Sequence, residues 1–129
     1  MTNQYEVYHA NDLFAAYQRV LAHDPAPLLP TYYHKVADVQ AEHLQEVFVL
    51  TNTREQLWWY HPQVRPVPGA QPFRSTSIGD VIVQHDHVWL VDQTGFTPLQ
   101  WDTSHQQRSF GSRLWSRIRQ VFCSLRKRF

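Results

Sequence analysis

The amino-acid sequence predicts an α+β fold: a small, mostly antiparallel sheet with two packed helices and a basic amphipathic C-terminal helix. Three observations lead to this prediction. Residues 80–84 and 88–92 are two valine-rich runs separated by three residues, which is the pattern of a β-hairpin. Two earlier segments repeat apolar residues at helical spacing. The last 22 residues combine seven basic side chains with an apolar stripe and contain no acid.

The N-terminal third predicts one strand and one helix. Tyr5–His9 alternates aromatic and polar residues, as a strand does. Asn11 stands where a helix N-cap belongs, and Leu13, Phe14, Tyr17, Val20 and Leu21 at helical spacing predict a helix over 12–22. Asp24-Pro25-Ala26-Pro27 ends this helix, because proline cannot continue the hydrogen-bond ladder.

The middle of the chain predicts a strand over 32–39 and a helix over 41–50. Residues 54–72 are rich in tryptophan and proline, and we expect them to be either pinned to the body by their aromatic side chains or a functional surface. The hairpin over 80–92 follows, with His85-Asp86-His87 as its connection. Residues 95–99 add a turn and a short strand.

The charge of the chain is divided between its two parts. Residues 1–107 hold five basic and eleven acidic side chains, whereas the rest holds seven basic ones. We therefore predict a domain over 1–104 and a helical tail over 105–129, since such asymmetry marks an interaction segment. The tail has three possible uses: packing its apolar stripe on the body, binding an acidic partner or nucleic-acid phosphates, or lying on an anionic membrane. The nucleic-acid or membrane contacts would be Arg113, Arg117, Arg119, Arg126, Lys127 and Arg128.

Length and composition favour one soluble domain. The chain of 129 residues is 43% apolar and 14% aromatic, which is enough for one core. Cys123 is the only cysteine, so a disulfide framework is excluded, and a reducing cytoplasm fits. The first residues lack a secretory signal, and no apolar run approaches the ~18–20 residues that span a bilayer. We expect a cytoplasmic protein.

The sequence contains no recognised catalytic motif. A nucleophile elbow, a His-Glu-x-x-His helix and a glycine-rich dinucleotide turn are all absent. His85 and His87 share a face and, with Asp86 or Asp92, have ligand types that suit a metal, but solvated histidines at a hairpin tip are the stronger expectation. We therefore expect no enzyme activity, no metal and no cofactor.

Two short motifs have a structural and a functional interpretation. Arg74-Ser75-Thr76-Ser77-Ile78-Gly79-Asp80 predicts a hydrogen-bonded entry into a strand, with Gly79 supplying backbone freedom and Asp80 bonding to its own turn. The alternative is a polar recognition patch in which Arg74 contacts an anion. Trp58 and Trp59 are either core residues or an exposed aromatic platform.

The order of these motifs resembles a known group of sequences. Residues 33–39, 44–52 with Trp58 or Trp59, 74–82 and Gly95-Phe96 together resemble small uncharacterised proteins of plasmids, phages and other mobile elements. The end of the pattern is similar to YodL-like domains. The resemblance covers about residues 32–99 and implies no catalytic residue. It implies a mobile-element accessory protein, of a kind that includes inhibitors of host defence.

From these observations we expect a non-enzymatic binding protein that docks on another protein, in its sharpest form by blocking a host-defence complex. An acidic body can compete for basic surfaces that bind nucleic acid. Nucleic-acid binding through the tail and tryptophans, and membrane association through the tail, remain the alternatives. The predicted partner-binding residues are Glu42, Glu46, Trp58, Trp59, Arg74 and Asp86, with Glu55 on the same acidic face.

Overall fold

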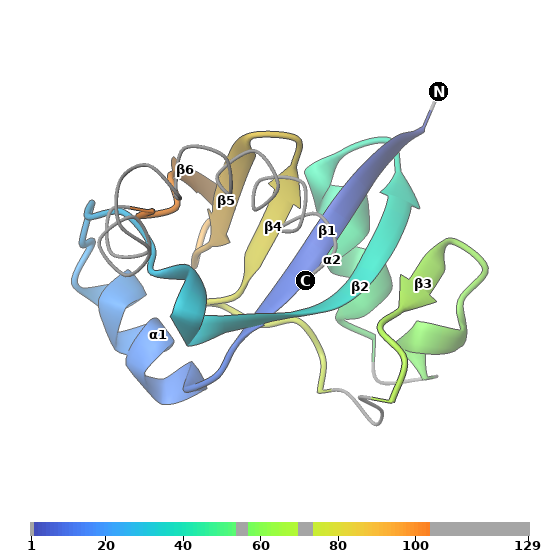
Figure 1. Cartoon of the computed structure of the whole chain (residues 1–129), viewed down its shortest axis with the longest axis horizontal. Coiled ribbons are helices and arrows are strands. Elements are labelled where there is room, and N and C mark those ends of the chain that lie inside the picture. The colour runs from blue at the N-terminus through green and yellow to red at the C-terminus, as the bar shows by residue number, and fades with distance from the viewer. Residues whose placement is uncertain (1, 54–56, 70–73, 104–129) are drawn as a thin grey trace, which may run out of the picture.

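The computed structural model describes residues 2–53, 57–69 and 74–103, and within them the chain forms one six-stranded antiparallel sheet with two helices (Figure 1). The strand order is β3-β2-β1-β4-β5-β6. The strands are β1 (Asn3–Ala10), β2 (Tyr33–Ala41), β3 (Val64–Pro66), β4 (Val81–Gln84), β5 (His87–Val91) and β6 (Phe96–Leu99). The helices are α1 (Leu13–Leu21) and α2 (Leu44–Thr51), and two single 3₁₀ turns are η1 (Pro30–Tyr32) and η2 (Trp58–Tyr60).

β1 is the centre of the sheet because it pairs with β2 on one side and with β4 on the other. α2 and η2 cover one face, where Val47 and Trp58 pack with Val7 and Ile82. Figure 1 shows α2 behind β1 and β2, and α1 beyond the end of β1. A second cluster joins Val20 of α1 to Tyr8 and Leu28, and to Val81, Val83 and Val88 of β4 and β5. The predicted α+β architecture is confirmed for the described residues.

The two edge strands are short and each contains a proline. β3 has three residues and pairs with β2, where Pro66 lies opposite Ala37. β6 has four residues, with Pro98 opposite Trp89 on β5. Proline has no backbone N–H to donate, so it is tolerated at a sheet edge. The sequence did not predict β3, which lies inside the segment rich in tryptophan and proline.

Several predicted boundaries need correction. The N-cap of α1 is Asp12, whose carboxylate accepts the Ala15 N–H at 3.1 Å, and not Asn11. The side chain of Asn11 instead donates to the carbonyl of Thr31 and contacts His34. α2 begins three residues later than expected, because Ala41 still belongs to β2. The predicted basic C-terminal helix and the whole tail over 105–129 lie outside the described residues.

The hairpin between β4 and β5 is confirmed, but its turn is shorter than predicted. Gln84 pairs directly with His87, which leaves two turn residues instead of three. His85, the first of them, has φ +55°, a value that two-residue hairpin turns require and that few side chains adopt. Among the described helices, none is both long enough and apolar enough to cross a bilayer.

Gly79 lets α1 approach the start of β4. Its φ is +101°, and a Cβ built there lies 2.9 Å from the Cβ of Ala16 and 3.2 Å from the carbonyl carbon of Ala16. Glycine is therefore required twice, for the backbone conformation and for the close contact with the helix.

We expect Gly79→Ala to lower the free energy of unfolding by about 2–4 kcal/mol, because it adds backbone strain and a clash with α1. Gly69→Ala is the matched control: Gly69 also has a positive φ of +79°, but no atom lies within 4 Å of a Cβ added at this position. This control should cost about 1 kcal/mol. Urea unfolding of the three proteins measures both values, and equal losses would show that the contact with Ala16 does not matter.

Candidate functional site

The polar turn (residues 74–80) is built around a fully buried carboxylate. The side chain of Asp80 is 0% exposed. Arg74 donates to both of its oxygens, at 2.6 and 2.7 Å, in a bidentate pair. The backbone N–H groups of Ala10 and Ser77 donate to the same carboxylate at 2.8 and 2.7 Å. The anion that Arg74 binds is therefore an internal one, and the predicted strand entry is confirmed.

The same turn joins three elements that are distant in the sequence. Arg74 donates to the carbonyl of Ala10 at the end of β1. Thr76 bonds through its N–H to the carbonyl of Thr51, the last residue of α2, at 2.9 Å. The indole N–H of Trp58 donates to the carbonyl of Arg74 at 3.2 Å. The contacts fix β1, α2 and η2 around one point.

His9 belongs to this buried network. Its side chain is 2% exposed, and its Nε2 lies 3.0 Å from the hydroxyl of Thr76 and 3.9 Å from a carboxylate oxygen of Asp80. Burial lowers the pKa of His9 to about 4, with a smaller contribution from Arg74, while Asp80 acts in the opposite direction. The imidazole is therefore neutral near pH 7. Since Thr76 and Asp80 are also fully buried, the cluster offers no surface to a substrate.

The two tryptophans do not form an exposed platform. Trp58 is 1% exposed and Trp59 is 6% exposed, and their rings pack edge to face at 5.6 Å. The core alternative is correct for both, and the partner-facing role predicted for their indoles needs correction. Arg74, one-third exposed, is committed to Asp80. Of the predicted partner-binding residues, this leaves the three acids.

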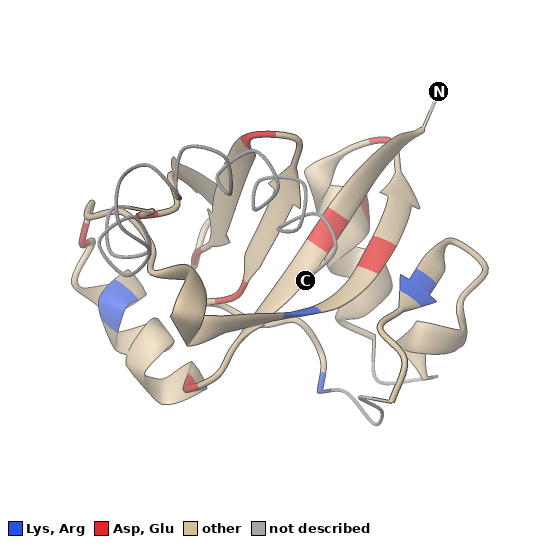
Figure 2. Ribbon diagram, viewed as in Figure 1, with Lys and Arg blue, Asp and Glu red and all other residues tan. Residues whose placement is uncertain are grey.

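Strand pairing brings those three acids to one end of the sheet. β1 runs antiparallel to both neighbours, so its first residues lie beside the end of β2 and the end of β4. Glu42 follows β2, Glu46 is in the first turn of α2, and Asp86 is in the turn after β4. We call Glu42, Glu46 and Asp86 the acidic end; Figure 2 shows both turns in red at the top of the ribbon. Glu55 lies outside the described residues.

Glu46 also has a structural task. Its carboxylate accepts the backbone N–H of Glu42 at 2.8 Å and the side-chain amide of Gln63 at 3.2 Å. The bond from the Glu42 N–H, followed by that from Gln63, lowers the pKa of Glu46. His43 caps the helix by accepting the N–H of Glu46, so the pair satisfies two free donors at the start of α2. Glu42 and Asp86 are the exposed members of the acidic end.

Two of the four described basic side chains form ion pairs with carboxylates of the same chain. The described residues include ten acidic side chains and four basic ones, Arg19, Lys35, Arg65 and Arg74. Buried Lys35 contacts Glu6 at 3.4 Å and Asp38 at 2.9 Å, and Arg74 contacts Asp80. Burial raises the pKa of Glu6, and Lys35 opposes this effect. The remaining acids outnumber the remaining bases, as Figure 2 illustrates.

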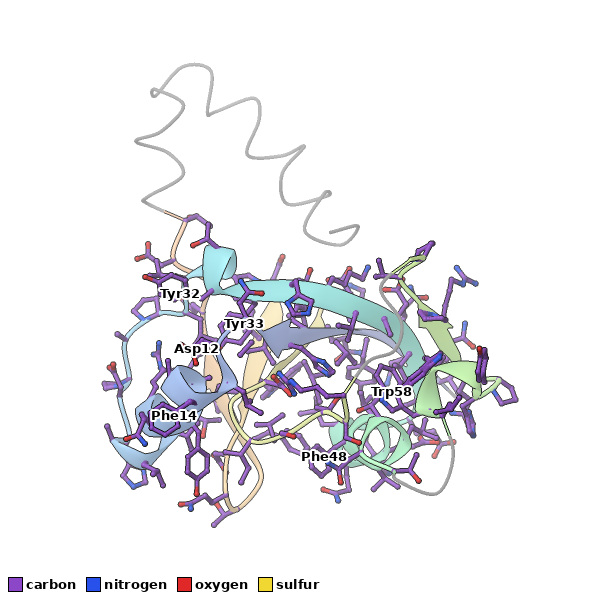
Figure 3. The ribbon with its side chains drawn as sticks, turned by 90° about the horizontal axis from the view of Figure 1, so that it is seen from below. Asp12, Phe14, Tyr32, Tyr33, Phe48 and Trp58 are labelled. Carbon is purple, nitrogen blue, oxygen red and sulfur yellow. The ribbon has the colours of Figure 1, made fainter. Side chains whose placement is uncertain are left out.

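Two surface hollows flank α1. The first, the α1 hollow, has a volume of about 680 Å³ and lies between α1, the 24–29 loop and η1; Asp12, Tyr32 and Tyr33 line it (Figure 3). The second, the α1–α2 groove, has about 600 Å³ and is lined by Phe14, Tyr17 and Phe48, among others. Phe14 is 72% exposed and Tyr17 36%. Of the apolar residues at helical spacing that predicted this helix, Val20 alone is buried.

The hairpin histidines do not gather ligands. His87 stacks on Trp89 with ring centroids 5.5 Å apart. Within the described ranges, no group of three or more histidine, cysteine, aspartate or glutamate side chains is placed to hold a metal ion.

No family model, curated protein or solved structure matches this chain. The function must therefore be inferred from the geometry of the residues themselves.

We expect Asp80→Asn to lower the free energy of unfolding by about 2–4 kcal/mol. The change removes the charge that compensates Arg74 in a buried pair. The loss of stability stays moderate because the guanidinium is one-third exposed and water screens its charge. Asp92→Asn is the matched control, because Asp92 accepts two backbone N–H groups in a half-buried turn and an amide oxygen can replace it. Its loss should stay below about 1 kcal/mol by urea unfolding. Similar losses for both would contradict a special role of the buried pair.

His9 predicts a pH dependence with a defined sign. Its pKa is 6.5 in the unfolded chain and about 4 in the folded one, so between these values only the unfolded state takes up the proton. Stability should therefore be complete above pH 6.5 and fall by roughly 1.4 kcal/mol per pH unit below it, up to about 3 kcal/mol. The His9→Gln variant should lack this component. The difference between the two proteins, measured from pH 4 to 7, cancels contributions from other groups such as His34 and Glu6.

Proposed function

We propose that this protein is a non-enzymatic binding protein that docks on a protein partner with a basic surface. The observation that supports the proposal most directly is the acidic end, where strand pairing gathers Glu42, Glu46 and Asp86. The four described cations belong to other elements: α1, β2, β3 and the polar turn. Among the described residues, the acidic end therefore presents charge of one sign.

Charge of one sign on a folded surface selects and attracts a partner of opposite sign. Complementary charges raise the rate of encounter and exclude wrong partners, whereas each exposed pair adds only modest affinity. At the acidic end itself, the Glu46 carboxylate accepts the Glu42 N–H and the Gln63 amide, and the pairing of Gln84 with His87 fixes the turn that carries Asp86. The site is thus held in place before binding, and this reduces the entropy lost on association.

The nature of the partner follows from its charge. Proteins that bind nucleic acid expose basic surfaces, so an acidic module can compete with the phosphate backbone for them. The resemblance to proteins of mobile elements favours an accessory protein of this kind, one that inhibits a host-defence complex in the cytoplasm. This specific role depends on the resemblance, and the docking mode depends on the charges.

Direct nucleic-acid binding is the less favoured function. The two tryptophans predicted for this function do not supply a stacking platform, because Trp58 and Trp59 are buried and single-stranded nucleic acid needs exposed rings on which bases stack. The basic contacts that nucleic-acid binding needs, and membrane association, both depend on the tail, which lies outside the described residues.

The test removes charge from the acidic end and leaves the fold intact. A partner captured from host lysate is identified, purified and titrated with the wild-type protein and with Glu42→Gln/Asp86→Asn. Two lost pairs of about 0.5–1 kcal/mol each predict roughly 5- to 30-fold weaker binding, with a smaller effect at high salt. Glu46 stays unchanged because it caps α2.

Gln18→Lys/Gln93→Lys is the matched control, since it changes the net charge by the same two units at exposed positions in α1 and in the turn after β5, at the opposite end of the sheet. We expect it to bind like the wild type. If both double variants bind equally well, the acidic end is not the docking surface.

A further inference from the structure

The α1 hollow combines an apolar lining with an acidic rim. Its apolar residues come from α1, from the 24–29 loop and from η1, and Tyr33 closes one side. Three carboxylates, those of Asp12, Asp24 and Asp102, belong to its lining. Arg19 is the one cation among the lining residues, and it donates to the backbone carbonyls of Asp24 and Ala26. The hollow therefore suits an occupant that is both apolar and positively charged.

The chain itself leads an occupant of this kind to the hollow. After β6, Trp101 forms a parallel β-bridge with Leu28 of the 24–29 loop. The N–H of Leu28 donates to the carbonyl of Gln100 at 2.8 Å, and the N–H of Asp102 donates to the carbonyl of Leu28 at 2.7 Å. Trp101 packs edge-on against Tyr8 and Tyr33, with ring centroids 5.5 and 5.8 Å apart. Asp102 is thus fixed at the rim, and residue 104 follows two positions later.

The sequence after residue 103 matches the hollow in chemistry. It contains seven basic residues and no acid. Phe110, Leu114, Ile118, Val121 and Leu125 recur at three- and four-residue steps, which predicts one apolar stripe if the segment is helical. Twenty residues of helix extend about 30 Å, so length does not prevent the segment from returning across the hollow.

We propose that residues 104–129 dock in the α1 hollow of their own chain, with the apolar stripe against Ala15, Leu29 and Tyr32 and the arginines near Asp12, Asp24 and Asp102. A tethered segment competes at an effective concentration in the millimolar range, which favours it over a second copy or a free partner. Docking brings opposite charges together at the α1 side and leaves the acidic end, at the other end of the sheet, as a separate surface. This docking is independent of the proposed partner.

Cys123 makes the test direct, because it is the only cysteine and, at helical spacing, lies on the face opposite the apolar stripe, where a label does not block docking. A nitroxide attached to Cys123 in the full-length, ¹⁵N-labelled chain should broaden the amide signals of Ala15, Leu29 and Tyr32. The signals of Glu42 and Asp86 should stay sharp. Raising the salt concentration should reduce the broadening, since part of the attraction is between charges.

Ala15→Arg is the variant that should release the segment, because it places a cation in the lining of the hollow while arginine remains a good helix former. Gln18→Arg is its control: it adds the same charge on an exposed position of α1 outside the hollow. We expect the first to lose most of the broadening and the second to keep it.

Three results would overturn the proposal. The first is the absence of broadening at the hollow in the unmodified full-length chain, a result that does not depend on any variant folding. The second is broadening at the α1–α2 groove in its place. The third is broadening at the hollow of a ¹⁵N chain that carries no nitroxide when a spin-labelled chain without ¹⁵N is added, which would assign the hollow to a second copy. Each result leaves the acidic-end proposal to its own binding test.

Discussion

The bidentate pair between Arg74 and the fully buried Asp80 is the interaction on which the described structure depends. A carboxylate removed from water is strongly destabilising unless it is paired and hydrogen-bonded, and here two guanidinium N–H groups and two backbone N–H groups donate to it. One of those backbone groups belongs to the last residue of β1. The pair therefore links the central strand to the loop that enters β4, and α2 and η2 join through Thr76 and Trp58.

This internal use of cations explains why the surface formed by the described residues is acidic. Lys35 and Arg74 face carboxylates in the interior, so they neutralise buried charge and contribute little to the field outside. The acids that remain lie in turns and at helix starts, where their carboxylates accept backbone N–H groups, as Asp12, Glu46 and Asp92 do. The same residues thus end or cap elements and create the negative surface.

The sequence predicted the α+β architecture, but it did not predict which side chains meet the core and which form the surface. Two valine-rich runs with a short connection predicted the hairpin, and the turn chemistry of Gly79 and Asp80 predicted the strand entry. Both are local signals in the sequence. β3 was missed because its three residues, the last of which is Pro66, become a strand only through pairing with β2. Periodicity placed Phe14 and Tyr17 on one helix face but could not say whether that face meets the core or the solvent. The partner of Arg74 and the gathering of Glu42 with Asp86 depend on tertiary pairing, which no local pattern encodes.

The prolines of the two outermost strands limit how this molecule can be recognised. Pro66 and Pro98 remove an N–H from each margin of the sheet, and both margins are short. A foreign peptide that tried to extend the sheet would find an incomplete row of donors on either side, and so would another molecule of the same kind. Ribbon-like stacking into fibres is disfavoured for the same reason. The edges of the described sheet therefore disfavour a ligand that adds a strand, and they favour recognition through side chains on faces and turns.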